Sequence, residues 1–202
     1  MDQNDQITKI FQKSKALFIQ EGVRNVTMEK IAKELGISKK TIYCYFENKA
    51  DLVCQSVKYD IENLESQIEY LTQSSKNAIE EMLIIGDFIS KSMDKFKSSR
   101  INELENFYPK SYKQIDLHRK IYVVKKISKN IERGIAEEIY RKEIEIEKVV
   151  LMYLTTTAAL FDQKTIPIEN YSISEIYITY LDYHLQAILN ENGRKLYSKI
   201  KM

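Results

Sequence analysis

The sequence predicts an all-α protein, with an N-terminal three-helix domain that contains a helix-turn-helix and a larger C-terminal helical domain, about nine helices in all. Three observations lead to this fold class. Only five Gly and two Pro occur among 202 residues, so helix breakers are rare. No run of strict polar–apolar alternation is long enough to require a sheet. Helix-capping residues recur at close spacing at Thr27, Ser38 and Asn48.

The caps define two short helices and the start of a third. Thr27 precedes the first apolar period and can cap a helix that Gly36 ends, since glycine suits the left-handed C′ position. Ser38 caps a second helix predicted over residues 39–45, and Asn48 caps the next one. Two short helices joined by a glycine turn are typical of a helix-turn-helix, whose second helix enters a DNA major groove. The alternative is a solvated helix in an ordinary bundle, which the tight capping disfavours.

Helical spacing divides the second short helix into two faces. Ile42 and Phe46 can face the preceding helices, with Tyr45 shared between the faces. The start and far side of the helix carry Lys39, Lys40, Thr41, Tyr43 and Cys44. Two cations, a hydroxyl, a phenol and a small thiol are suited to phosphates and base edges.

This region resembles the TetR family of bacterial transcriptional regulators. The resemblance rests on Ala16, Leu17, Phe18 and Gly22 in the leading helix, on VTMEKIAKELGISKKTIYCYF and on ENKADL, and it covers residues 7–54. KNIERGIAEEIYRKEI and ILNENGRKLYSKI add weaker similarity in the larger domain. The resemblance implies a DNA-binding domain over residues 1–47 and a helical ligand-sensing and dimerisation domain over 48–202.

The resemblance also implies roles for individual side chains. The base readers are expected to be Lys39, Thr41 and Cys44, and the phosphate contacts Thr27, Tyr43, Tyr45 and Lys49, with Ser38 and Lys40 completing the DNA-binding set. Two positions depart from the family pattern. Lys40 stands where a small residue is frequent, and Cys44 where a larger polar or aromatic residue is usual. The base preference therefore cannot be copied from any relative.

The remaining helices follow from apolar periodicity and breakers. The first helix carries Ile7, Ile10, Phe11, Leu17 and Phe18 and stops near Gly22. Further helices are predicted over residues 48–71, 77–96, 101–107, 109–139, 146–161 and 174–189. A polar tail is predicted after Asn192.

Charge is distributed unevenly along the chain. Residues 1–50 contain nine Lys and Arg against six Asp and Glu, net +3, whereas the remainder contains 22 against 23, net −1. The DNA-binding end is therefore basic, as expected of a protein with one nucleic-acid surface. The small excess predicts modest non-specific binding, so specific contacts and dimer geometry must contribute much of the affinity.

Export, membrane and metal signals are missing. The start MDQNDQ has no apolar region, and no continuous apolar stretch in the sequence is long enough to cross a bilayer. Cys44 and Cys54 form no CxxC, which argues against zinc and against a disulfide framework. We expect a cytoplasmic, nucleoid-associated bacterial protein with no membrane partner. A redox role for Cys44 beside the lysines stays open.

The resemblance implies a homodimer in which the last two helices pair with their copies. The two segments supply apolar and small residues at helical spacing, as a twofold four-helix seam requires. The expected interface consists of Val150, Tyr153, Leu154, Ala158, Ile176, Tyr180, Tyr183, His184 and Ala187.

The resemblance also implies an unknown small-molecule ligand among the central helices. The candidate ligand-binding residues are Phe88, Met93, Tyr112, His118, Tyr122, Tyr153 and Thr156. Each has an alternative role in core packing, and His118 can be a surface or hydrogen-bonded histidine. The hydroxyls of Thr155, Thr156 and Thr157 either line a polar wall or bond back to helix carbonyls.

No catalytic motif accompanies these features. GxSxG, HExxH, P-loop and Rossmann glycine patterns and metal-ligand clusters are absent, so we expect no enzyme, no catalytic residue, no cofactor and no metal. The favoured hypothesis is a ligand-responsive regulator, a repressor released from a palindromic double-stranded operator by an inducer. The alternatives are a ligand-free architectural DNA-binding protein and a helical interaction protein. A closed cavity among residues 80–160 would favour the ligand-responsive regulator over the architectural protein.

Overall fold

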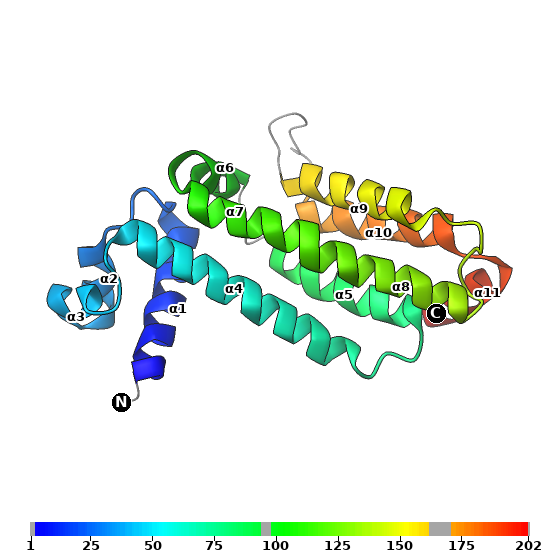
Figure 1. Cartoon of the computed structure of the whole chain (residues 1–202), viewed down its shortest axis with the longest axis horizontal. Coiled ribbons are helices and arrows are strands. Elements are labelled where there is room, and N and C mark those ends of the chain that lie inside the picture. Colours follow the sequence, from blue (N-terminus) through cyan, green and yellow to red (C-terminus); the bar gives the residue numbers. More distant parts are fainter. Residues whose placement is uncertain (1–2, 94–97, 162–170, 202) are drawn as a thin grey trace. The chain divides into compact units, whose positions relative to one another are not determined.

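A computed structural model of the chain describes residues 3–93, 98–161 and 171–201, and the regular structure in these ranges is helical (Figure 1). The predicted all-α fold is confirmed. Among the described residues, extended pairing is limited to one isolated antiparallel bridge between Tyr140 and Leu189. None of the helices in these ranges combines the length and the apolar character needed to span a bilayer.

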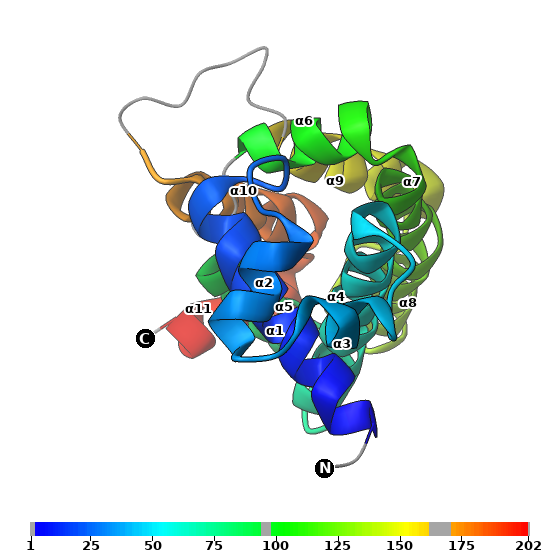
Figure 2. The same ribbon diagram turned by 90° about the vertical axis from the view of Figure 1, so that its left-hand side faces the viewer.

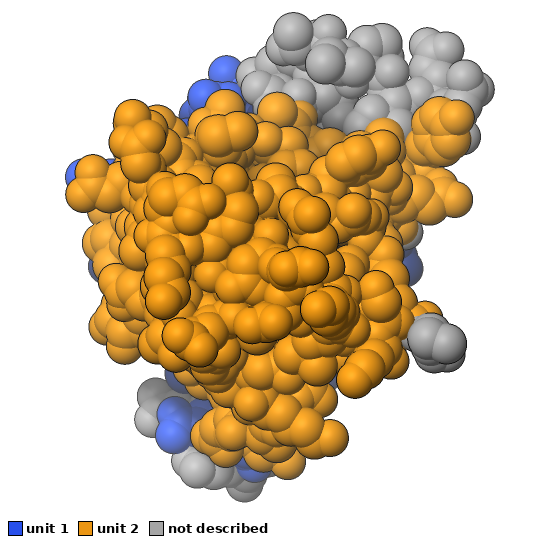
Figure 3. Space-filling model, turned by 90° about the vertical axis from the view of Figure 1, so that its right-hand side faces the viewer, with its two compact units in different colours: residues 1–64, 95–116 blue, residues 65–94, 117–202 orange. Residues whose placement is uncertain are grey.

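The chain divides into two compact units (Figure 3). Unit 1 contains Met1–Leu64 and Lys95–Asp116, and unit 2 contains Glu65–Asp94 and Leu117–Met202. Both units are therefore discontinuous in sequence. The functional division between residues 47 and 48 stays a prediction.

Unit 1 contains the predicted helix-turn-helix. Its elements are α1 (Gln3–Glu21), α2 (Met28–Leu35), α3 (Lys39–Tyr43), the first part of α4 (Lys49–Thr72), α6 (Ser98–Phe107) and most of α7 (Pro109–His118). Helix α2 packs against both α1 and α3 (Figure 2). The fully buried side chains between them include Ile10, Ile31, Ile42 and Leu52, which hold the three short helices to the start of α4.

Unit 2 is a helical bundle. Its elements are the end of α4, α5 (Ala78–Met93), a π-helical turn η1 (Arg119–Val123), α8 (Val124–Ala136), α9 (Ile146–Phe161), α10 (Ile173–Ile188) and α11 (Glu191–Lys201). Helix α5 packs against α8 and α10, and α9 lies beside α8 and α10 (Figure 1). A Cβ on Gly86 would lie 2.1 Å from the Leu181 side chain, so this glycine permits the close approach of α5 and α10.

The helix predicted over residues 109–139 is wrong in two respects. The π-helical turn separates α7 from α8, and α8 ends at Ala136. The chain then turns at Glu138, whose φ of 55° is left-handed, and the Tyr140 ring packs against Gly134, where a Cβ would lie 2.1 Å from a ring carbon. Ile139 is buried outside any helix, so its apolar character extended the predicted stripe too far.

The polar tail predicted after Asn192 is also wrong, because the chain forms α11 there. The Asn190 side chain accepts a hydrogen bond from the Gly193 amide at 2.9 Å and caps the helix. Gly193 does not break the helix; a Cβ at this position would lie 2.1 Å from the Ile139 carbonyl oxygen. With α11 and the split at the π-turn, the described ranges contain α1 to α11 rather than about nine helices.

Smaller differences concern helix ends. Helix α3 stops at Tyr43 rather than at residue 45, and α10 starts at Ile173 because Ser172, not a later residue, forms the capping box with Glu175. Helix α6 starts at Ser98. The predicted end of α5 at residue 96 lies outside the described residues.

Candidate nucleic-acid interface

The predicted caps of the helix-turn-helix are confirmed. The Thr27 hydroxyl accepts from the Lys30 amide at 3.1 Å, and Gly36 is left-handed with φ 66°. The Ser38 hydroxyl accepts from the Thr41 amide at 3.0 Å and thereby fixes the start of α3. The same amide also donates to the Ser38 carbonyl at 3.0 Å, so the cap residue holds the first turn of this short helix through both its hydroxyl and its carbonyl.

The two faces of α3 are also as predicted. Ile42 is fully buried, and Phe46 just beyond the helix is 1% exposed. Tyr45 is half-buried against the same core. The exposed side consists of Ser38, Lys39, Lys40, Tyr43 and Cys44, with Thr41 half-buried between them. The candidate base readers Lys39 and Cys44 are therefore exposed, the first at the start of α3 and the second directly after its end.

Lys39 has an intramolecular partner. Its ammonium forms an ion pair with the Glu29 carboxylate of α2, which raises the pKa of Lys39 and lowers that of Glu29. The Tyr43 ring centre lies 5.7 Å from the same ammonium. Both members of the ion pair are more than half exposed, so the pair contributes little stability and the ammonium can exchange to another acceptor.

Lys49 lies at the start of α4 and is half-buried. Its ammonium donates to the Arg24 carbonyl at 2.8 Å, and burial lowers its pKa. The Tyr108 ring centre lies 5.9 Å away. Because an ammonium has three donors, two remain for a further acceptor such as a phosphate oxygen.

Three of the predicted dimer residues lie inside unit 2. Val150, Tyr153 and His184 are between 3% and 8% exposed and pack within one protomer, so they offer little surface to a second copy. The other predicted residues of α9 and α10 are exposed or half-buried, namely Leu154, Ala158, Ile176, Tyr180, Tyr183 and Ala187. Sequence reasoning missed Leu151 and Met152, which are 64% and 68% exposed on α9. The sequence shows both as large apolar residues of a predicted helix, and their exposure is seen only in the structure.

The seven candidate ligand residues are divided between the two units and have different surroundings. Tyr112 packs on the core of unit 1, Met93 is buried beside Tyr177, and the Tyr153 hydroxyl shares a hydrogen bond with the Tyr177 hydroxyl at 3.1 Å. Thr156 is half-buried. The hydroxyls of its neighbours Thr155 and Thr157 bond back to the helix carbonyls of Leu151 and Tyr153, both at 2.8 Å.

His118 and Tyr122 are held by acidic residues of α4 in unit 2. The His118 Nδ1 atom lies 2.7 Å from a Glu65 carboxylate oxygen, and its ring stacks on Tyr122 with centres 5.3 Å apart. The Tyr122 hydroxyl donates to Glu69 at 2.9 Å, and burial together with this carboxylate raises the tyrosine pKa. The alternative role as a hydrogen-bonded histidine thus describes His118.

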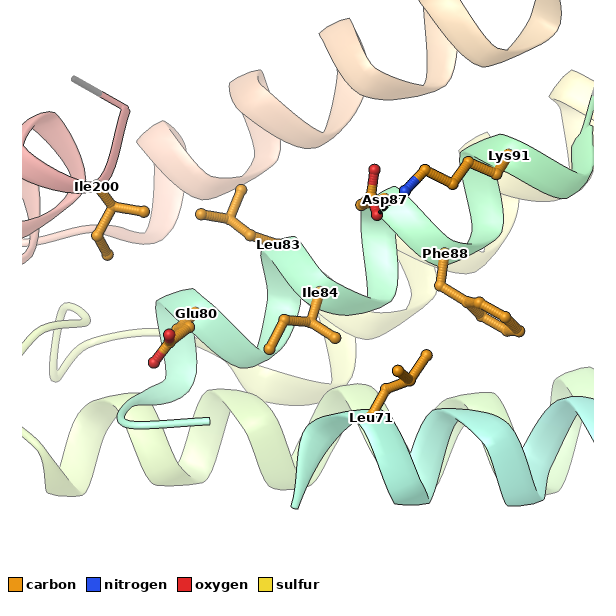
Figure 4. A pocket seen from close by; sticks show the side chains of 8 residues that line it. All are labelled: Leu71, Glu80, Leu83, Ile84, Asp87, Phe88, Lys91 and Ile200. Atoms are coloured by element: carbon orange, nitrogen blue, oxygen red, sulfur yellow. Dashed lines mark hydrogen bonds and ion pairs between the residues drawn. The ribbon is translucent and has the colours of Figure 1, made fainter. Parts of the chain in front are cut away.

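Phe88 lines an open groove of about 460 Å³ in unit 2 (Figure 4). The apolar lining comes from Leu71, Leu83, Ile84, Phe88 and Ile200, and the charged lining from Glu80, Asp87 and Lys91. Asp87 and Lys91 pair at 2.6 Å along α5. The groove is not the closed cavity that would distinguish a sensor from an architectural protein.

Metal-binding clusters of three or more His, Cys, Asp or Glu side chains do not occur within the described ranges. Cys44 and Cys54 are both free thiols. Cys54 lies in unit 1, where the Gln114 amide donates to its sulfur at 2.9 Å.

Comparisons with known proteins agree with the geometry. Residues 10–55 match the family described as bacterial regulatory proteins, tetR family. A helix-turn-helix-type transcriptional regulator of Staphylococcus aureus is 34% identical over 73 residues, which are 36% of this chain and 40% of that protein. The matched segment thus spans less than half the length of this curated relative.

Solved structures resemble the chain over most of its length. A TetR transcription regulator from Haloarcula marismortui has a TM-score of 0.78 at 18% identity, with 93% of this chain and 100% of that chain covered. The regulator FadR from Bacillus subtilis, solved in complex with stearoyl-CoA, has a TM-score of 0.68 at 17% identity, with 90% and 98% covered. At these identities the likeness shows a shared fold.

Proposed function

We propose that this chain, which belongs through its N-terminal domain to the TetR family of bacterial regulatory proteins, is a ligand-responsive transcriptional repressor that leaves a palindromic operator when a small molecule binds. The observation that carries the proposal is α3 itself. Its first turn is fixed by Ser38, its inner face is buried through Ile42, and its outer face presents Lys39 and Lys40. A helix anchored in this way and basic on its outer side is suited to a major groove.

The DNA contacts are assigned by chemistry. Lys39, Thr41 and Cys44 face base edges, and Thr27, Tyr43, Tyr45 and Lys49 contact phosphates, with Ser38 and Lys40 beside them. To contact DNA, Lys39 must leave Glu29, and this costs little free energy because the ion pair is exposed to solvent.

A homodimer would present two copies of α3. Successive major grooves on one face of DNA lie about 34–36 Å apart, so a dimer with this spacing reads a palindrome. The large exposed apolar side chains Leu151 and Met152 on α9 and Tyr183 on α10 lie on two helices that pack together, and their burial against a second copy of the same helices supports a self-complementary interface.

The groove lined by Phe88 is the candidate inducer site. Its lining is mainly apolar with a few charged groups, the composition typical of small-molecule sites. The likeness to a regulator solved with stearoyl-CoA supports a ligand with a substantial apolar part. The inducer must bind the DNA-incompetent state better, because only differential affinity shifts an equilibrium.

The direct test is recovery and sequencing of genomic fragments that the purified chain binds, with sizing and light scattering in parallel. We expect a palindromic consensus and a dimer of twice 23.8 kDa. A monomer at micromolar concentration, or recovery of DNA without a shared sequence, would refute the symmetric-operator model.

Two substitutions then test the assigned roles. Lys39→Ala should cost about 1–3 kcal/mol and relax the preference at one position per half-site, while Cys44→Ala should cost less. Binding-site selection on randomised DNA checks this, with Lys142→Ala, an exposed lysine of unit 2 outside the groove, as a charge-matched control. Identical preferred sequences for Lys39→Ala and wild type would show that Lys39 contacts phosphates only.

A further inference from the structure

We propose that Glu103 of α6 is a positioning residue for DNA binding, which holds the loop between α1 and α2 and, through this loop, the Lys49 ammonium where it can contact a phosphate. The inference rests on the proposed function, because the phosphate role of Lys49 belongs to it. Glu103 lies well outside the matched residues 10–55, so the helix-turn-helix motif alone does not predict it.

The loop forms a backbone cradle around the Glu103 carboxylate. The oxygen Oε2 accepts from the Val23 amide at 2.6 Å and from the Arg24 amide at 3.2 Å. The preceding Gly22 is left-handed with φ 85°, and a Cβ on it would lie 2.9 Å from Oε1. Two successive amides behind a left-handed glycine suit an anion, and hydrogen bonds to a charged acceptor are among the stronger ones.

Arg24 is held by three different contacts. Its amide donates to Glu103, its guanidinium lies 4.1 Å from the centre of the Phe107 ring, and its carbonyl accepts from the Lys49 ammonium at 2.8 Å. Two of these contacts come from α6 and the third from α4. Loss of the Glu103 contact therefore removes the hydrogen bonds that hold the backbone on which Lys49 is anchored.

Glu103 also acts on Lys49 through its charge. Burial lowers the pKa of the Lys49 ammonium and the neighbouring Arg24 lowers it further, whereas the Glu103 carboxylate opposes both effects. The carboxylate therefore favours the charged form of Lys49, which is the form that a phosphate attracts.

A positioning role for Glu103 and a purely electrostatic role predict opposite effects of its removal on DNA affinity. An acid near a DNA-binding surface repels phosphates, so removal of its charge alone should tighten binding. If Glu103 positions Lys49, removal should weaken binding. The sign of the effect thus distinguishes the two roles.

Three variants of the full chain distinguish the effect of the Glu103 charge from the effect of its side-chain length. Glu103→Gln keeps the length and loses the charge, and Glu103→Asp keeps the charge and shortens the side chain. Glu105→Gln removes an exposed acid from the same helix and serves as the matched control. The probe is a mixed-sequence duplex of about three helical turns, titrated over a series of salt concentrations.

We expect Glu103→Gln and Glu103→Asp each to weaken binding about tenfold, and Glu105→Gln to leave it unchanged or tighten it. The slope of log affinity against log salt should fall by about one in both Glu103 variants, since one phosphate contact is lost. In a Lys49→Ala background, Glu103→Gln should have little further effect. A merely structural role would lower the unfolding midpoint without changing the slope.

Hydrogen exchange of the wild type provides a test that needs no variant. The Val23 and Arg24 amides should be protected, because their acceptor is Glu103. Unprotected amides, an unchanged salt slope, or equal or tighter binding by Glu103→Gln would overturn the inference. Absence of any DNA binding by the wild type would overturn the proposed function together with it.

Discussion

His184 should make the stability of the protein depend on pH in a predictable way. The imidazole is 8% exposed between the Tyr153 and Tyr180 rings, whose centres lie 5.2 and 6.0 Å away. Its Nε2 atom has no hydrogen-bond partner among the described residues. Burial therefore disfavours the charged ring and lowers the pKa of His184 from 6.5 to about 4.

The sign of the pH effect follows from the two protonation states. Above the unfolded-state pKa, the ring is neutral in both states and carries no penalty. As the pH falls below 6.5, the unfolded chain binds a proton that the folded chain excludes, so stability is lost until the folded-state pKa of about 4 is reached. The full loss is about 3 kcal/mol, of which about 2 kcal/mol falls between about pH 7 and about pH 5.

The measurement compares wild type with His184→Leu, which cannot titrate. Denaturant unfolding at a series of pH values and at one fixed protein concentration gives the free energy of unfolding of each, since an oligomer's apparent stability depends on concentration. Any constant cost of the substitution cancels in the pH dependence. We expect the wild type to lose about 2 kcal/mol more than the variant over this interval. Parallel curves for the two proteins would refute the assignment of a buried neutral imidazole.

Further predictions concern packing and the α3 surface. Gly134→Ala should destabilise unit 2 by about 1–3 kcal/mol, because its Cβ would overlap the Tyr140 ring; an unchanged denaturation midpoint would contradict this packing. Glu29→Gln should tighten DNA binding about two- to fivefold in a fluorescence anisotropy titration, because it frees the Lys39 ammonium and removes an acid; weaker binding would mean that the ion pair positions Lys39. Ser38→Ala should lower the free energy of unfolding by about 1 kcal/mol, and an unperturbed value would show that the cap contributes nothing.

Local signals predicted the helix-turn-helix well. Thr27, Gly36 and Ser38 determine the helix ends through hydrogen bonds and backbone angles that involve only their nearest neighbours in sequence. Such interactions can be read from a short stretch of residues. The fold class and the buried face of α3 were predictable for the same reason.

Apolar periodicity failed to predict the helix ends where packing outside the helix decides the path of the chain. Ile139 continues an apolar stripe, yet Glu138 turns the backbone so that Tyr140 packs against Gly134. The residues after Asn192 were predicted as a polar tail, but they form α11, and Gly193 allows this helix to approach the Ile139 carbonyl. Apolar character predicts burial without stating which partner covers the residue.

The sequence by itself determined the capped helices, the basic N-terminal end and the set of side chains on α3. The tertiary structure decided which apolar residues of α9 stay exposed, since Val150 and Tyr153 turn inward while Leu151 and Met152 do not. It also decided that Glu103 meets the loop at Val23, about 80 residues earlier in the chain. Burial and long-range hydrogen bonds depend on how helices pack, and no local pattern encodes that geometry.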